Sequence, residues 1–143
     1  MGGNRHMRNT VRFLAFLVLL LAIGGGAVAC STEPASPLDE NAVREYADPA
    51  TETCLQGLSE HDVAKYTENA NADFKAAVTQ EILDETATKL DNQLGPYQSK
   101  EFLKTEEKDG YIIVHYKAKY EKGDVGVRMV FDGDELIAGQ WFE

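Results

Sequence analysis

Three polar side chains fall on strand positions that otherwise carry apolar residues. Tyr116, Tyr120 and Gln140 lie on the inward-facing positions of two predicted strands, on the side expected to hold the core. A buried amide needs hydrogen-bond partners, and tyrosine hydroxyls can provide them. Two interpretations stay open: a satisfied polar network inside the core, and a pocket that takes a small apolar ligand.

These residues do not predict an enzyme. Proton-transfer enzymes with such a cavity depend on a carboxylate inside it, and the inward strand positions carry no acidic residue beyond the turns. The sequence also has no glycine-rich phosphate loop, no Cys or His pair at metal-ligand spacing and no serine nucleophile motif. We therefore expect no catalytic residues and no cofactor.

The opposite face of the same strands combines aromatic and basic residues in an otherwise acidic chain. Its members are Tyr111, Ile113, Arg128, Ile137 and Trp141. Aromatic residues together with Arg are typical of protein interfaces. We expect this face to bind a second copy of the chain or an envelope protein, unless the helices or a terminus cover it.

His61 and Cys54 are the remaining candidates for reactive chemistry in the domain. His61 stands beside Glu60 and Asp62, but these three side chains do not converge on one face, so we expect no metal site. Cys54 falls at helical spacing with apolar residues on both sides, which predicts a small buried hydrophobic residue rather than a nucleophile.

The thiol of Cys30 has a different chemistry, because it follows an export signal. Three arginines precede an apolar run over residues 13–23, and three glycines then lead into Ala27-Val28-Ala29-Cys30. A cysteine directly after two small residues resembles the lipobox of prokaryotic lipoproteins, in which the thiol is lipid-modified and starts the mature chain. We expect residues 1–29 to be a lipoprotein signal peptide and the lipid on Cys30 to anchor the protein outside the cytoplasm, at the cell membrane.

Two alternatives remain for this terminus. Ala27-x-Ala29 also fits an ordinary signal peptidase, in which case the protein is secreted and a Cys30–Cys54 disulfide becomes feasible. The other alternative is an uncleaved membrane anchor, although the apolar run is shorter than the ~20 residues that a spanning helix needs.

The charge balance limits the kinds of partner. Three of the 14 basic residues precede Cys30, whereas all 24 acidic residues follow it, so the chain from Cys30 onward carries a formal charge of −13. Nucleic acid is not expected as a partner, because phosphate contacts need clustered Lys or Arg. Anionic lipid headgroups would also repel the protein, so the lipid itself has to hold it at the membrane.

Helical periodicity predicts that the first half of the domain is helical. The polar stretch over residues 30–37 contains two prolines and is expected to be a tether. An apolar stripe runs from Val43 to Leu58, with Asp48-Pro49 either starting a new helix or bending the first one. We expect a second, short helix over residues 60–69, capped by Ser59.

The clearest predicted helix begins at a Thr79 cap and ends at Gly95-Pro96. The period then changes to two, and turns separate four predicted strands, over residues 97–107, 111–121, 125–131 and 136–142. The sequence thus predicts an α+β fold over residues 38–143, with N-terminal helices packed on one side of a curved four-stranded antiparallel sheet.

This order of elements resembles the nuclear transport factor 2-like (cystatin-like) cone, and the chain is similar to the family called domain of unknown function 3887. The resemblance covers most of residues 40–143. Members of that family can be fused ahead of hydrolase domains, which implies an accessory role facing a substrate or partner and supplies no catalytic residues. The matching residues are Leu58, Asp62 to Phe74, Leu90 to Gly95, Tyr97, Tyr116-x-Ala118-x-Tyr120, Val130 to Gly133 and Ile137 to Gly139.

The expected function is that of a membrane-tethered extracytoplasmic lipoprotein with a small non-catalytic binding domain. Its partners would be the membrane, through the lipid on Cys30, and a second copy, an envelope protein or a small apolar ligand. A soluble secreted ligand-binding domain is the first alternative, and an isomerase-like enzyme is the second.

Overall fold

The computed structural model describes residues 37–143, in which four helices are followed by four strands. This order confirms the predicted α+β fold. The predicted signal peptide, Cys30 and all but the last residue of the predicted tether lie outside the described residues. Among the helices of residues 37–143, none is long and apolar enough to cross a membrane.

The first helix, α1 (Glu40–Ser59), is continuous although it contains Pro49. Asp39 caps it, because its carboxylate accepts hydrogen bonds from the backbone N–H groups of Asn41 and Ala42. A separate helix starting at Pro49 is therefore wrong. Proline removes one intrahelical hydrogen bond, but the helix buries side chains on both sides of it, which offsets that loss. Its buried residues are Val43, Ala47, Ala50, Thr51, Cys54, Leu55, Gly57 and Leu58.

The helix expected over residues 60–69 is shorter than predicted, and an additional short helix follows it. The first, α2 (Val63–Tyr66), is capped by Asp62 and not by Ser59, which ends α1 instead. The second, α3 (Ala72–Ala77), was not expected and is capped by Asn71. Each cap side chain accepts a backbone N–H of the following turn, so local hydrogen bonding decides these boundaries.

The last helix, α4 (Gln80–Leu94), has the predicted ends. The Thr79 hydroxyl accepts the N–H of Ile82, and Gly95 follows with a φ of 76°, a conformation that favours glycine. Only Leu83 and Ala87 are fully buried, while Leu90 and Leu94 are partly buried. The helix therefore packs through a narrow stripe.

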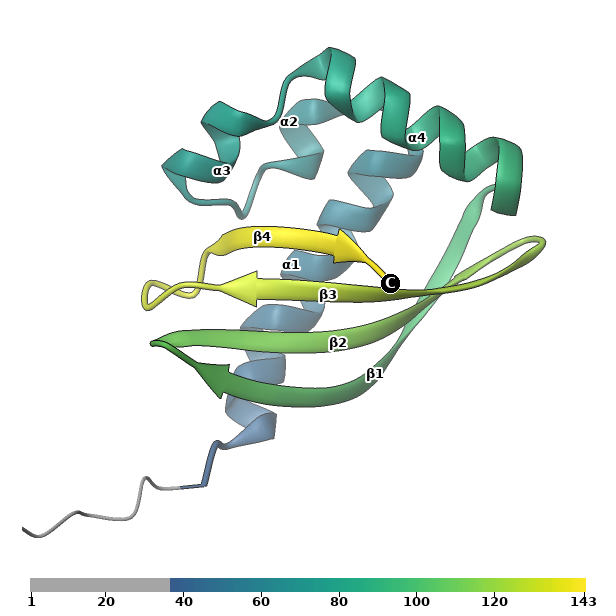
Figure 1. Cartoon of the computed structure of the whole chain (residues 1–143). Coiled ribbons are helices and arrows are strands. Elements are labelled where there is room, and N and C mark those ends of the chain that lie inside the picture. Colours follow the sequence, from purple (N-terminus) through teal and green to yellow (C-terminus); the bar gives the residue numbers. More distant parts are fainter. Residues whose placement is uncertain (1–36) are drawn as a thin grey trace, which may run out of the picture. The chain divides into compact units, whose positions relative to one another are not determined.

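The strands are β1 (Tyr97–Lys108), β2 (Tyr111–Tyr120), β3 (Gly123–Phe131) and β4 (Ile137–Phe142). They form one antiparallel sheet in sequential order, as three hairpins predict. Figure 1 shows α1 crossing one face of the twisted sheet while α4 lies beyond the β4 edge. The core lies between α1 and the sheet, where Val114, Tyr116, Val127, Met129 and Phe131 are almost completely buried.

A register shift in β4 reverses part of the predicted facing. Phe131 pairs with Ile137, whereas Val130 pairs with Gly139, so one extra residue is accommodated between the two pairs. Because one extra residue inverts the alternation, Ile137 faces the core together with Gln140 and Phe142. The expectation that Ile137 lies on the outer face is wrong. Its neighbour Leu136, which strict alternation with Gln140 would place inside, is 37% exposed.

Candidate functional site

The inward tyrosines are held in the core. Tyr116 is buried, and its hydroxyl donates a 2.9 Å hydrogen bond to the Asp48 carboxylate of α1. Arg44 pairs with the same carboxylate at 3.0 Å. Burial, and then the hydrogen bond to Asp48, raise the pKa of Tyr116. A carboxylate on α1 thus reaches the inward face, although the strands themselves supply none.

The side chain of Gln140 bonds to neither Tyr116 nor Tyr120, the partners that the sequence suggested. Its side-chain oxygen accepts a hydrogen bond from the hydroxyl of Tyr66, which sits on the short helix α2. Its amide nitrogen is buried and finds no hydrogen-bond partner among residues 37–143. Tyr66 was missed because α2 is only four residues long and has no clear apolar period.

The three candidate pocket residues are therefore not joined in one network. Tyr116 is bonded to α1, Gln140 is bonded to α2, and Tyr120 packs edge-to-face on Tyr97 with ring centroids 5.6 Å apart. A hollow of about 460 Å³ on the helical side is lined by other residues, which come from α1, the α2–α3 link and the β3–β4 turn. They are Tyr46, Pro49, Ala50, Thr53, Glu68, Asn69, Asp134, Glu135 and Leu136.

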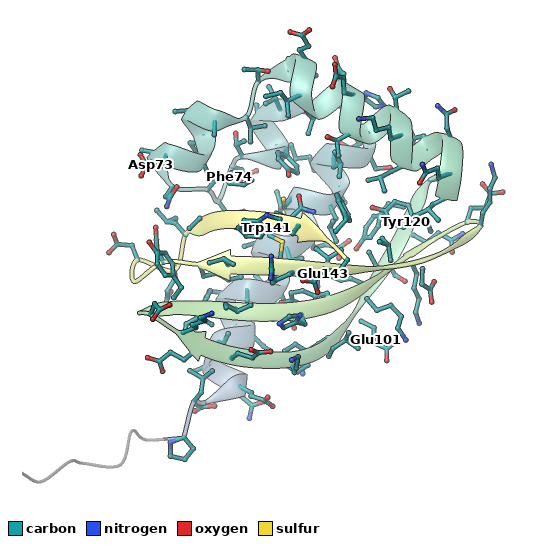
Figure 2. The ribbon with its side chains drawn as sticks, viewed as in Figure 1. Asp73, Phe74, Glu101, Tyr120, Trp141 and Glu143 are labelled. Carbon is teal, nitrogen blue, oxygen red and sulfur yellow. The ribbon has the colours of Figure 1, made fainter. Side chains whose placement is uncertain are left out.

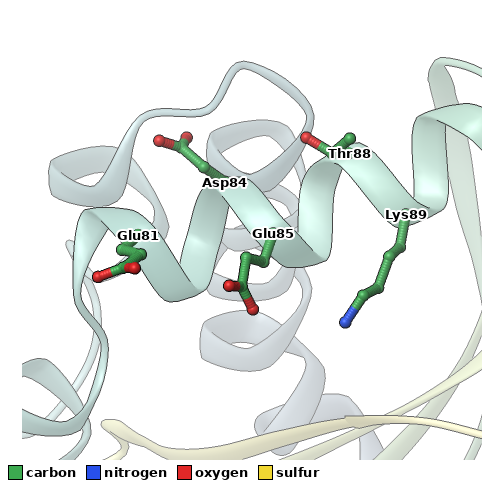
Figure 3. A pocket seen from close by; sticks show the side chains of 5 residues that line it. All are labelled: Glu81, Asp84, Glu85, Thr88 and Lys89. Carbon is green, nitrogen blue, oxygen red and sulfur yellow. The ribbon is translucent and has the colours of Figure 1, made fainter.

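A wider hollow, of about 610 Å³, follows the solvent-facing side of α4 (Figure 3). It is lined by Glu81, Asp84, Glu85, Thr88 and Lys89. In Figure 3, Asp84 points away from Glu85 and Lys89, so the polar groups do not converge on one point. This surface contains none of the residues that the sequence predicted to bind a ligand.

The outer face of the sheet brings together most of the predicted interface residues. Trp141 is 47% exposed, and the guanidinium of Arg128 stacks on its ring at 4.8 Å. The ring also covers Gly139, where a side chain would collide with it. Tyr111 is exposed and Ile113 is partly exposed at the other end of the face. Figure 2 shows Trp141 and Glu143 on this side, opposite α1.

A row of charged and polar side chains crosses the outer face beside Trp141. Arg128 pairs with Glu143 at 3.4 Å, and His115 lies 3.6 Å from Glu143 and 3.2 Å from Glu106. Sequence reasoning missed the two glutamates because the first strand contains two register shifts and Glu143 follows the last strand. Arg128 pairs with Glu143 and Lys104 pairs with Glu106, so acidic and basic groups are nearly balanced in this row beside Trp141.

The structure also shows the surroundings of Cys54 and His61, the two candidates for reactive chemistry in the helical half. Cys54 is fully buried, as expected, and burial raises the pKa of its thiol well above the ordinary value. His61 does not use its neighbours Glu60 and Asp62. Its ring instead contacts Asp84 and Asp91 on α4, a pairing between distant segments that spacing could not predict.

Comparison with known families matches residues 51–139 to the model described as protein of unknown function (DUF3887). That range is more than half of the chain. The chain belongs to the DUF3887 family. The DUF3887 match runs from the middle of α1 to Gly139 in β4, and it stops two residues before Trp141.

No curated protein matches this DUF3887 chain. Among solved structures, it is similar to the NMR structure of a protein from Ruminococcus gnavus ATCC 29149, with 22% sequence identity and a TM-score of 0.51. The similarity covers 73% of this chain and 90% of the other. At this level of identity the likeness concerns the fold alone.

Proposed function

We propose that this DUF3887 protein is an extracytoplasmic lipoprotein whose domain self-associates through the outer face of its sheet. The observation that carries the proposal is the exposed Trp141 stacked on Arg128, on a sheet face that no helix of residues 37–143 covers. Large aromatic residues paired with Arg dominate binding energy at many protein interfaces. We also propose that the domain belongs to the nuclear transport factor 2-like superfamily, whose members commonly dimerise through a sheet.

Charge favours a second copy as the occupant of this face. The pairing registers place five of the chain's basic residues on the outer face, Lys104, Lys108, Lys117, Lys119 and Arg128. The same registers and Glu143 add four acidic residues, so the face is nearly neutral although the whole chain has a formal charge of −10. Two copies that meet here keep their acidic helical sides apart, which reduces the electrostatic repulsion between them.

Membrane attachment rests on Cys30. Cys30→Ser is expected to move the protein from the membrane fraction to the soluble fraction, because serine cannot form the thioether that carries the lipid. Circular dichroism of the soluble chain should match that of the wild-type domain. Immunoblots of separated membrane and soluble fractions measure the change. Unchanged membrane retention would contradict the lipid anchor and support an uncleaved helix.

Self-association is tested in the Cys30→Ser chain, which carries no lipid. Trp141→Ala combined with Arg128→Glu should raise the dimer dissociation constant at least about tenfold, since it removes the aromatic anchor and reverses its paired charge. Sedimentation equilibrium over a range of concentrations measures this constant. Ile82→Ala, at a residue that is 50% exposed on α4, is the matched control and should change nothing. A parent chain that stays monomeric at all concentrations would overturn the proposal.

A further inference from the structure

His61 lies in the turn after α1, and its side chain contacts two residues along α4. Its Nδ1 lies 3.1 Å from an oxygen of Asp84, and its Nε2 lies 3.4 Å from an oxygen of Asp91. The two carboxylates are seven positions apart in the sequence, so one imidazole spans two turns of the helix. The backbone of His61 has a φ of 57°, in the left-handed region that few residues other than glycine adopt. The turn therefore aims the ring at α4.

The protonation state of His61 decides whether both contacts are attractive. A neutral imidazole has one N–H and donates one hydrogen bond, whereas the imidazolium has two N–H groups and donates to both carboxylates. Hydrogen bonds to Asp84 and Asp91 raise the pKa of His61. Hydrogen bonds from Gln80 and His61 lower the pKa of Asp84. Deprotonation leaves one ring nitrogen lone pair facing a carboxylate.

The two carboxylates next to His61 in the sequence bond to other groups and not to the imidazole. Glu60, next to His61 in the turn, is 2.8 Å from the ammonium group of Lys65 on α2. Asp62 accepts the backbone N–H of Lys65 as the cap of α2. Asp84 and Asp91 on α4 are thus the carboxylates within contact distance of the imidazole.

Apart from the contacts of His61, few side chains hold α4 against the rest of the domain. Two of its fifteen residues, Leu83 and Ala87, are fully buried. Gln80 adds a neutral brace, because its amide donates to the His61 carbonyl oxygen at 2.8 Å and to Asp84 at 2.9 Å. The helix is therefore held by a thin apolar stripe and by contacts that centre on one histidine.

We propose that α4 is a flap over the part of the core beyond the β4 edge, and that the His61 imidazolium latches it. Below the raised pKa of His61 the latch is closed, and it is lost as the pH rises through that pKa, because the neutral ring cannot bond both carboxylates. At the acidic end the latch weakens as Asp84 becomes protonated, below its ordinary pKa of 3.8. The latch residues do not belong to the outer face of the sheet, so this inference does not depend on self-association through that face.

Cys54 reports the opening of the flap. Cys54 is completely buried on α1, in the same core cluster as Leu83 and Ala87 of α4. The sequence has two cysteines, so the full chain with Cys30→Ser keeps Cys54 as its single thiol. The rate at which a small thiol reagent labels Cys54 then measures how often this part of the core opens.

The experiment compares that parent chain with His61→Asn between pH 5.5 and 8.5. Asn tolerates the left-handed backbone but carries no charge. Dividing the labelling rate of the variant by that of the parent at each pH cancels the intrinsic reactivity of the thiol. We expect a ratio of at least about three at pH 5.5 that falls toward one as His61 of the parent deprotonates.

A second variant and a matched control complete the test. Asp91→Asn leaves the turn untouched and should give the same profile, so the result does not depend on how His61→Asn folds. His115→Asn removes the histidine that pairs with Glu106 and Glu143 on the outer face, and its ratio should stay at one. A ratio that does not change with pH in both latch variants, whether one or higher, would overturn the latch.

Discussion

Gly57→Ala is expected to lower the free energy of unfolding by about 3 kcal/mol or more, although alanine has a higher helix propensity than glycine. Alanine in a helix is normally more stable than glycine by about 0.5–1 kcal/mol. A Cβ at position 57, however, would lie 2.3 Å from the backbone nitrogen of Tyr66 and 2.7 Å from its Cα. Backbone atoms cannot move aside as a flexible side chain can, so α2 has to shift.

Urea unfolding followed by circular dichroism measures this change. Gly133→Ala is the matched control, because a Cβ at position 133 would meet no atom within 4 Å. That variant should stay within about 0.5 kcal/mol of the wild type. A stabilising effect of Gly57→Ala would mean that α1 and α2 do not approach each other as closely as described.

Ile137→Ala is expected to destabilise the domain by about 2–5 kcal/mol, because Ile137 is completely buried at the start of β4. Its backbone N–H donates to the carbonyl oxygen of Asn69, and its carbonyl oxygen accepts from the N–H of Asn71. These bonds fix the strand against the α2–α3 link, so the surroundings cannot easily collapse into the cavity that the smaller side chain leaves.

The neighbouring residue supplies the control for the register of β4. Leu136→Ala removes a partly exposed side chain and should cost less than about 1 kcal/mol in the same urea experiment. Strict alternation through β4, without the register shift, predicts the opposite order of the two effects. A larger loss for Leu136→Ala than for Ile137→Ala would therefore contradict the described facing.

Local patterns in the sequence predicted the elements whose boundaries depend on local physics. The cap at Thr79 and the left-handed Gly95 bound α4 as expected, since both act through the backbone within a few residues. The three hairpins followed from turn residues and from period-two alternation, which the inward facing of Tyr116 and the outward facing of Trp141 confirm.

Packing between distant segments decided the rest. Alternation cannot reveal the extra residue in β4, which turns Ile137 inward, because strand pairing places it. The partners of Gln140 and His61 lie 74 and 30 residues away, on Tyr66 and Asp91, and only the folded chain brings them together. The sequence by itself determined that helices precede a four-stranded antiparallel sheet, and it determined which face most strand residues share. Tertiary structure decided which side chains meet across them, since such contacts depend on the positions of whole elements and not on local periodicity.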